Sequence, residues 1–243
     1  MQLFWGLLII ALGSFGQSSS YVPVNRVKQW SWEGFWLTQG VFAWVLFPLA
    51  GACFALPAGS GLMSLFSADG ALRAIVFGAL WGVGGLTFGL SMRYLGVALG
   101  QSVSLGTCSA FGTLLPALFG GTNLMEGSGL VLLAGVCITL AGIAVIGYAG
   151  FLREKTMSRA DRTAAIRDFT KGLLVALLAG VMSACFALGL DAGQAFRVQA
   201  VAAGVDPLFA GLPVVFLVTL GGFLTNALYC FYLRRRAEEA QAA

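Results

Sequence analysis

The chain has no histidine, and charged residues make up only 10% of its 243 residues. It also lacks the GxSxG and HExxH motifs and any pair of carboxylates at helical spacing. Acid–base, nucleophilic and zinc chemistry depend on such residues and motifs. The glycine runs join no predicted strand to a helix, so they are not a dinucleotide-binding motif. The sequence therefore predicts no enzymatic activity, no cofactor and no metal site.

Cysteine is also scarce, and the five residues are far apart and form no CxxC pair. All of them lie within hydrophobic segments, where free cysteine behaves as a small apolar side chain. The sequence therefore predicts packing roles, and neither disulfide bonds nor metal ligands, for Cys53, Cys108, Cys137, Cys185 and Cys230.

Hydrophobic residues, in contrast, make up 58% of the chain. A soluble domain has about 45–50% apolar and about 25% charged residues, so a water-soluble fold is excluded. The charges are clustered and leave long uncharged runs, and about 20 apolar residues cross a bilayer as a helix. The sequence predicts an all-α polytopic membrane protein with seven transmembrane helices, within residues 1–25, 34–68, 74–92, 94–125, 127–152, 172–190 and 207–233.

The distribution of basic residues predicts the orientation of these helices. With seven spans, only Arg73 and Arg197 fall on one side of the membrane, and the other Lys and Arg residues fall on the opposite side. The positive-inside rule then places the central loop and the C-terminus in the cytoplasm and the N-terminus outside. The net charge of +4 indicates contact with the anionic headgroups of the lipid bilayer. It does not point to a nucleic-acid partner.

Glycine is the next abundant residue, with 34 copies that fall mainly inside the predicted spans. Small residues let helices approach closely in lipid, where no hydrophobic effect drives them together. Two faces of small residues are therefore predicted to pack helices: Gly78, Gly82, Gly85 and Gly89 on the third span, and Gly96, Gly100, Ser104, Cys108, Gly112 and Pro116 on the fourth.

A short internal repeat predicts how the chain is organised. Residues 6–14 (GLLIIALGS) resemble residues 172–180 (GLLVALLAG), at the start of the first and sixth spans. Five spans precede the second copy, so it would be inverted, which is a transporter architecture. The predicted units are a five-helix repeat (1–152), a basic cytoplasmic loop (153–171), the first two helices of an incomplete second repeat (172–233) and a cytoplasmic tail (234–243).

Polar and aromatic residues within the spans are candidates for a binding site. Amides and aromatic rings suit a neutral polyhydroxylated ligand, whose hydroxyls need hydrogen-bond partners and whose C–H faces pack on rings. Gln101 shares a predicted face with Ser104, Thr107 and Cys108. The alternative is that small polar side chains bond to their own helix and that tryptophans lie at the membrane interface. The candidate substrate-binding residues are Gln17, Trp44, Trp81, Phe88, Gln101 and Asn226.

Three carboxylates are candidates for proton coupling, because a proton-driven carrier needs a group that titrates. Glu33 opens the second span among tryptophans, and burial there would raise its pKa. Asp191 closes the sixth span, and Asp206 precedes Pro207 at the predicted N-cap of the seventh. Each also has a structural alternative, and Glu33 would cap its helix or pair with Arg26 or Lys28.

Three sequence strings resemble one known family: VKQWSWEGFW (27–36), GALWGVGGLTFGLSMRYLGVALG (78–100) and GVDPLFAGLP (204–213). They are similar to the L-rhamnose/proton symporter family of the drug/metabolite transporter superfamily, and the likeness covers essentially the whole chain. The resemblance implies proton-coupled uptake of L-rhamnose, or a related sugar such as L-lyxose, through the bacterial inner membrane. It also implies ten helices in two inverted five-helix halves.

Members of that family continue for three more helices, and this chain ends at Ala243. The length leaves two other functions open besides alternating-access symport. One is a non-transporting membrane binding or scaffold protein, which would represent a truncated carrier and self-associate as a homo-oligomer. The other is an exporter of small metabolites, as in other branches of the superfamily.

Overall fold

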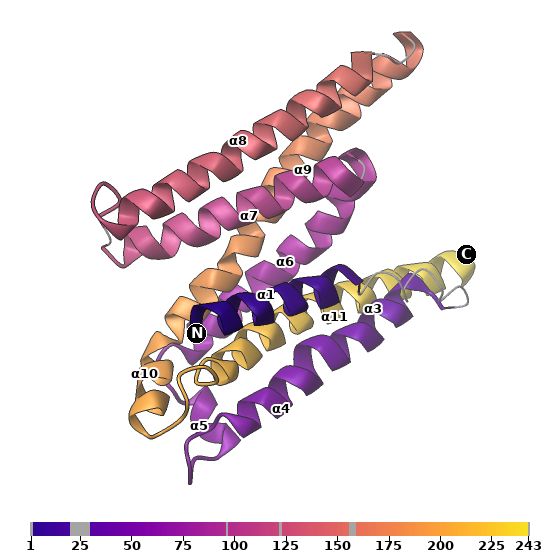
Figure 1. The fold of residues 1–243 in the computed structure, drawn as a ribbon. Helices are drawn as coiled ribbons and strands as arrows, with labels where there is room; N and C mark the ends of the chain where they lie inside the picture. The colour runs from indigo at the N-terminus through magenta and orange to yellow at the C-terminus, as the bar shows by residue number, and fades with distance from the viewer. Residues whose placement is uncertain (1, 20–29, 96, 122, 156–158, 243) are drawn as a thin grey trace.

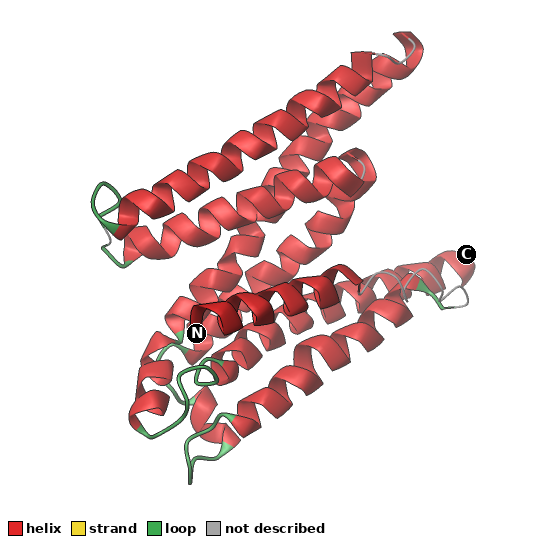
Figure 2. Ribbon diagram, viewed as in Figure 1, coloured by secondary structure: helices red, strands yellow, loops and turns green. Residues whose placement is uncertain are grey.

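The computed structural model describes residues 2–19, 30–95, 97–121, 123–155 and 159–242, and the regular structure in these ranges is helical throughout (Figure 2). Helices satisfy their own backbone hydrogen bonds, as lipid requires. The elements are α1 (Gln2–Ser19), α3 (Trp32–Gly40), the π-helix η1 (Val41–Leu46), α4 (Phe47–Phe54), α5 (Leu62–Phe66), α6 (Ala71–Leu95), α7 (Val97–Phe119), α8 (Ser128–Lys155), α9 (Arg159–Ala192), α10 (Gln194–Ala202) and α11 (Leu212–Ala242).

Six segments among the described residues are long and apolar enough to cross a membrane. They are Glu33–Phe54, Ala71–Met92, Leu99–Phe119, Ser128–Ala149, Phe169–Ala202 and Leu212–Ala240. The first predicted span corresponds to α1, whose apolar part, Phe4–Gly16, is shorter than the others. Residues 20–25 of that predicted span lie outside the described residues. The multi-pass helical class is confirmed, whereas the count of seven and the inverted repeat stay predictions.

Two helices, α6 and α9, form the centre of the molecule. They pack on each other, α11 packs on α6, and α7 packs on α9. Figure 1 shows α7 and α8 on one side of this central pair and α3, α4 and α11 on the other. The helix α8 contacts mainly α7. The chain therefore builds two helical groups that α6 and α9 join.

The predicted glycine face of α6 divides into two parts. A methyl group on Gly78 would collide with the Val218 carbonyl of α11, and one on Gly82 would lie 2.8 Å from the Gly222 carbonyl oxygen. In contrast, no described residue lies within 4 Å of a methyl group built on Gly85 or Gly89. The first two glycines therefore permit close packing on α11, as predicted, and the other two do not.

The predicted small face of α7 packs as expected along much of its length. Ser104 is buried against Gly180 of α9, where an added methyl group would lie 2.7 Å from the Ser104 carbonyl oxygen. Gly100 lies against Met92 of α6, and a methyl group on Gly112 would lie 3.7 Å from Ala187 of α9. Small residues thus let three helices meet without large side chains between them.

Large apolar side chains lie mostly on the outside of the molecule. Val131 and Ile138 of α8 are 75% and 73% exposed, whereas Ala176 and Ala179 of α9 are completely buried. This distribution is opposite to that of a soluble protein and suits a surface covered by lipid. The five cysteines are all free thiols.

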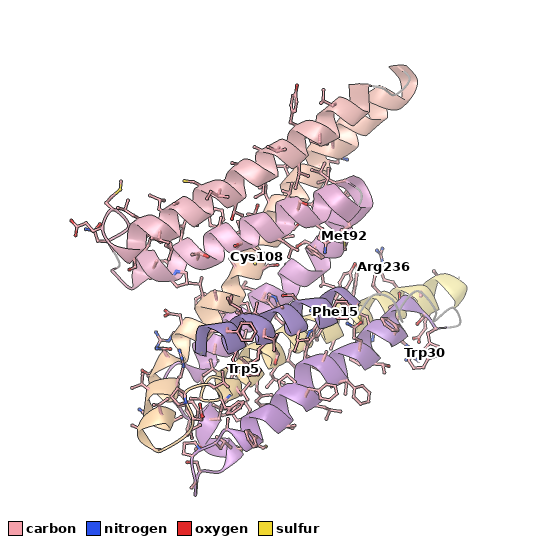
Figure 3. The ribbon with its side chains drawn as sticks, in the orientation of Figure 1. Trp5, Phe15, Trp30, Met92, Cys108 and Arg236 are labelled. Carbon is pink, nitrogen blue, oxygen red and sulfur yellow. The ribbon has the colours of Figure 1, made fainter. Side chains whose placement is uncertain are left out.

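The two ends of the molecule differ in their elements. Figure 1 shows the N-terminus, α5 and α10 at one end and the C-terminus at the other, where Figure 3 also places Trp30 and Arg236. The basic connection predicted as a loop is helical on both sides, because α8 continues to Lys155 and α9 begins at Arg159. Similarly, the predicted tail continues α11 to Ala242.

Candidate functional site

Four aromatic side chains from three parts of the fold form a continuous series of edge-to-face contacts. The ring centroids of Trp36 and Trp44 are 5.6 Å apart, those of Trp44 and Trp81 are 5.8 Å apart, and those of Trp81 and Phe186 are 5.2 Å apart. We call this set the aromatic chain. It joins α3 and η1 to α6 and α9, and contacts of this geometry each contribute about 0.5–1.5 kcal/mol beyond burial.

The π-helix η1 explains how Trp36 and Trp44 meet. Two residues eight positions apart on a regular α-helix differ by about 80° around its axis. A π-helix has more residues per turn, and its wider turns between Val41 and Leu46 reduce that difference. Pro48, which has no N–H to donate, follows immediately at the start of α4. The local backbone therefore brings both indoles to one face.

Asn226 connects the aromatic chain to α11. Its Oδ1 accepts a hydrogen bond from Trp36 Nε1 at 2.9 Å. Its Nδ2 donates to the Gly222 carbonyl at 2.8 Å and to the Gly82 carbonyl of α6 at 3.3 Å. The side chain is only 3% exposed. One amide therefore links three helices, and both of its N–H groups are engaged.

Two glycines make room for these rings. A methyl group on Gly222 of α11 would lie 2.5 Å from the six-membered ring of Trp81. A methyl group on Gly40 would lie 3.1 Å from Trp44 and 3.2 Å from Phe223. Any larger residue at Gly222 would therefore displace the Trp81 indole from its contacts.

Two other predicted substrate-binding residues, Phe88 and Gln101, do not join this cluster. Phe88 is half-buried on α6, two helical turns beyond Trp81. Gln101 is exposed on α7, whereas Ser104 and Thr107 are buried against α9, so the predicted polar face is divided. Gln17 belongs to α1, and its side chain lies outside the described residues. The structure thus brings together Trp44, Trp81 and Asn226 of the predicted set.

The three predicted coupling carboxylates occupy different environments. Glu33 is half-buried in the first turn of α3, and the N-cap of that helix is Ser31, whose Oγ accepts from the Gly34 N–H at 3.2 Å. Asp206 is not the N-cap of α11, which begins at Leu212. Instead, its Oδ1 accepts from the Leu208 N–H at 2.8 Å. The prediction that Asp206 is the N-cap of the seventh span was wrong because a turn, rather than the helix, follows Pro207, and its role in proton coupling stays a prediction.

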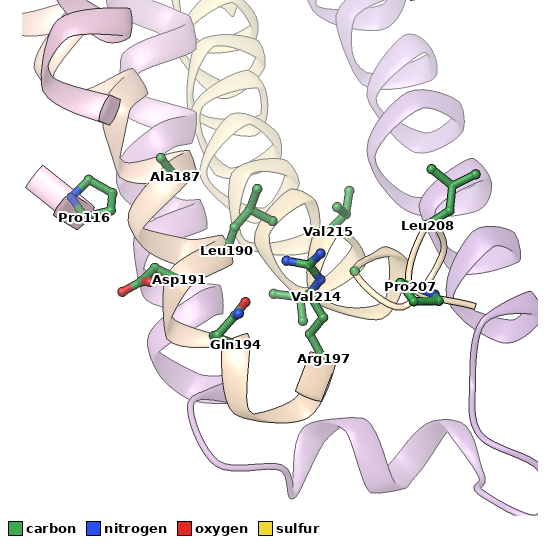
Figure 4. A pocket seen from close by; sticks show the side chains of 11 residues that line it. Pro116, Ala187, Leu190, Asp191, Gln194, Arg197, Pro207, Leu208, Val214 and Val215 are labelled. Carbon is green, nitrogen blue, oxygen red and sulfur yellow. The ribbon is translucent and has the colours of Figure 1, made fainter. Parts of the chain in front are cut away.

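Asp191 lines a cavity of about 430 Å³ at the end of the molecule that carries α10 (Figure 4). The α9–α10 elbow forms one wall, and the loop before α11 forms another. Figure 4 shows Gln194 and Arg197 directed toward the first turns of α11, and Asp191 on the side of Pro116. The lining residues are Pro116, Ala187, Leu190, Asp191, Gln194, Arg197, Pro207, Leu208, Gly211, Val214 and Val215.

Sequence reasoning missed several of these residues. Trp36 lies within the string at 27–36, but nothing in that string indicates that it hydrogen bonds a residue 190 positions away. Phe186 has no polar neighbour that would mark it. Gln194 and Arg197 follow Asp191 at steps of three residues, and that spacing was a usable signal for one helical face.

The helices, the apolar surface and the cavity between helices define a polytopic helical membrane protein. A family model described as L-rhamnose-proton symport protein (RhaT) matches residues 1–240. The chain belongs to this family, as the three strings predict. It is a family of transporters and not of enzymes.

Curated relatives named "L-rhamnose-proton symporter" match nearly the whole chain. The chain is 35% identical to one from Mannheimia succiniciproducens over 233 residues, which are 95% of this chain and 66% of the relative. It is 36% identical to one from Cronobacter sakazakii over 230 residues, or 93% and 66% of the two chains. It is 34% identical to one from Escherichia coli over 236 residues, with shares of 95% and 66%. The chain thus spans just under two thirds of each relative, and no solved structure matches it.

Proposed function

We propose that this chain takes part in proton-coupled uptake of L-rhamnose, or a related deoxy-sugar, across the bacterial inner membrane. The observation that carries the proposal is the family match over residues 1–240, together with relatives named L-rhamnose-proton symporter. The six long apolar helices are consistent with a carrier in a membrane. Transport would proceed by alternating access, in which two helical groups rearrange around the sugar.

The proposed orientation puts the N-terminus outside and the central basic connection and C-terminus in the cytoplasm. The positive-inside rule supports it, because Arg73 and Arg197 are the only basic residues assigned to the outer side. Residues 1–152 would form the first five-helix repeat, and residues 172–233 would begin an inverted second repeat. The end of the molecule that carries α10 and the cavity would then face outward.

The aromatic chain is the proposed inner contact surface for the sugar. Trp44 and Trp81 would supply the aromatic platforms, because C–H faces of sugars pack on rings. Asn226 would act mainly by holding Trp36 and α6 in place, since its N–H groups are engaged. Phe88 and Gln101 would contribute only in a state that brings their side chains closer to the aromatic chain, and Gln17 of α1 stays a proposed ligand.

Glu33 is the first candidate for the coupling proton. It is half-buried, lies one helical turn from Trp36, and is not needed as the helix cap. Asp191 is the second candidate because it lines the cavity. Asp206 is the weakest, since its carboxylate already stabilises the turn before α11.

Uptake of radiolabelled L-rhamnose into proteoliposomes tests the proposal directly. With an inwardly directed proton gradient, we expect accumulation above the outside concentration, and we expect its loss when a protonophore removes the gradient. Empty liposomes and an equal internal and external pH are the controls. Absence of gradient-dependent uptake of L-rhamnose and L-lyxose would contradict symport. Stabilisation by these sugars without flux would instead indicate a binding protein.

A further inference from the structure

We propose that the cavity between α7, α9, α10 and α11 is a second binding site, where a neutral polyhydroxylated molecule is captured before it reaches the interior. The identification of that molecule as a 6-deoxy sugar rests on the proposed function. The site is separate from the aromatic chain, because none of the four rings of that chain lines the cavity.

The walls of the cavity are fixed by the backbone. At the α9–α10 elbow, the Gly193 N–H donates to the Leu190 carbonyl at 3.2 Å, and the Arg197 N–H donates to the Gly193 carbonyl at 3.2 Å. A methyl group on Gly193 would collide with Val214 of α11. The elbow therefore packs directly on α11 and presents its polar side chains from a rigid support.

The opposite wall is equally well defined. The Asp206 carboxylate accepts from the Leu208 N–H at 2.8 Å. The backbone carbonyl of Asp206 accepts hydrogen bonds from the N–H groups of Phe209 at 2.9 Å and Ala210 at 3.0 Å. This turn holds Pro207 and Leu208 against the cavity. The cavity is thus formed before any ligand arrives, which reduces the entropy lost on binding.

The charges of the lining residues select a neutral ligand. Asp191 and Arg197 line the same cavity, yet within the described part of the chain they form no ion pair with each other or with any other residue. At the same end of the molecule, Asp69 and Arg73 do pair, at 3.5 Å. A carboxylate accepts hydrogen bonds, a guanidinium donates them, and a polyol does both. A ligand with charge of one sign only would be attracted by one of these groups and repelled by the other.

The remaining lining explains a preference for a deoxy-sugar. Gln194 both donates and accepts hydrogen bonds, whereas Leu190, Leu208 and Val215 offer apolar surface. A volume of about 430 Å³ lies within the range of small-molecule sites. A ligand with several hydroxyls and one methyl group matches this lining. We therefore infer that L-rhamnose binds in preference to L-mannose, which has a hydroxyl in place of a hydrogen on that methyl group.

Isothermal titration of the purified full chain with L-rhamnose and L-mannose tests this site. Arg197→Gln and Gln194→Ala are expected to weaken L-rhamnose binding at the cavity at least tenfold and to leave binding at the aromatic chain unchanged. Asp191→Asn removes the negative charge and leaves the positive charge of Arg197 in the cavity. It is therefore expected to weaken binding of L-rhamnose and to strengthen binding of the sugar acid gluconate. The matched controls, Asp69→Asn and Arg73→Gln, change an exposed pair at the same end and should stay within twofold of the unmodified chain. Melting temperatures within 2 °C of the unmodified chain, a small shift for a protein of this size, would confirm folding of each variant.

Thiol labelling gives a second measurement in the membrane. Gln194→Cys should react with a membrane-impermeant maleimide in right-side-out vesicles, and L-rhamnose should slow that reaction. Ser60→Cys, in the exposed loop before α5, should react at a rate that the sugar does not change. The unmodified chain, with its own five cysteines, gives the background.

The outcomes separate this site from the proposed function. If the cavity variants bind L-rhamnose like the unmodified chain, or if the chain binds no sugar, the capture site is overturned, whether or not uptake is observed. If the variants lose binding and sugar slows labelling of Gln194→Cys, the capture site is supported even when no gradient-driven uptake occurs. In that last case symport fails and the binding site remains.

Discussion

Asn226 joins α3, α6 and α11 through a single amide. Its three hydrogen bonds satisfy a side chain that is only 3% exposed, and an unpaired polar group is unfavourable in the interior of a membrane protein. Hydrogen bonds between membrane helices contribute on average about 0.6 kcal/mol and at most about 1.7 kcal/mol each. Because two of the three bonds connect Asn226 to other helices, the residue acts as a structural link.

Replacing this amide should separate the helices. We expect Asn226→Leu, which keeps the branched shape of the side chain, to lower the free energy of unfolding by about 1–3 kcal/mol, since the hydrogen bonds of Asn226 to Trp36 and Gly82 are lost. Thr219→Val is the matched control on the same helix, because Thr219 bonds only to carbonyls of α11 and should change stability by less than about 0.5 kcal/mol. Denaturant unfolding in mixed micelles measures both. Equal losses in the two variants would show that the hydrogen bonds between helices do not add to the free energy of unfolding.

At this scale the sequence identifies the polar and aromatic residues, but it does not predict which of them are in contact. Trp44, Trp81 and Asn226 were identified from their residue types alone. Their common location depends on Trp36 and on packing between segments more than a hundred residues apart. Gln101 and Ser104 are three positions apart and yet differ completely in burial, because the packing of α9 on α7 decides which face is covered.

At the scale of the helices, the contact between α6 and α11 depends on glycines from both sides. Gly78 and Gly82 of α6 meet Val218 and Gly222 of α11. A methyl group on Gly221 of α11 would collide with the Ile75 carbonyl in return. Backbones therefore lie against each other here, which gives the dispersion contacts that hold helices together in lipid.

Alanine substitutions along α6 test this contact. Gly78→Ala is expected to lower the free energy of unfolding by about 1–3 kcal/mol, because backbone must move to admit the methyl group. Gly85→Ala is the matched control on the same helix, where nothing lies within 4 Å, and it should be neutral or slightly stabilising because alanine favours helices. Thermal unfolding in detergent measures the difference. A stability of Gly78→Ala equal to that of Gly85→Ala would argue against close packing.

The spans themselves follow from the sequence, because uncharged runs and their lengths identify helices in lipid directly. Breaks in the helix within a span cannot be predicted from the sequence in the same way. The sequence predicts that the sixth span closes at Asp191, next to the end of α9 at Ala192, but it does not predict the separate α10 or the packing of Gly193 on Val214. The sequence does not predict the π-helix η1 either, although Pro48 indicates a local change in hydrogen bonding.

At the scale of the whole molecule, coupling requires that sugar and proton cross together. A gradient of one pH unit corresponds to about 1.4 kcal/mol, enough for about tenfold accumulation with one proton per sugar. The proton carrier must therefore titrate, whereas residues that only bind sugar need not. Replacing a carboxylate by its amide therefore distinguishes a proton-carrying residue from one that only binds sugar.

Glu33→Gln keeps the shape of the side chain and removes its titration. If Glu33 carries the proton, gradient-driven accumulation should fall from about tenfold to about onefold, while exchange of sugar at equal pH on both sides continues. Glu126→Gln, in the exposed loop before α8, is the control and should accumulate sugar normally. Normal accumulation by Glu33→Gln would assign the proton to another carboxylate, with Asp191 next.

The aromatic chain has an optical consequence. Trp36, Trp44 and Trp81 are half of the six tryptophans in the protein, and their rings lie edge to face at 5.6 and 5.8 Å between centroids. Indoles at such distances share electronic excitation, and their fixed mutual orientation gives strong near-ultraviolet circular dichroism. The spectrum of the unlabelled protein should therefore report whether α3, η1 and α6 are in contact, in any lipid or detergent.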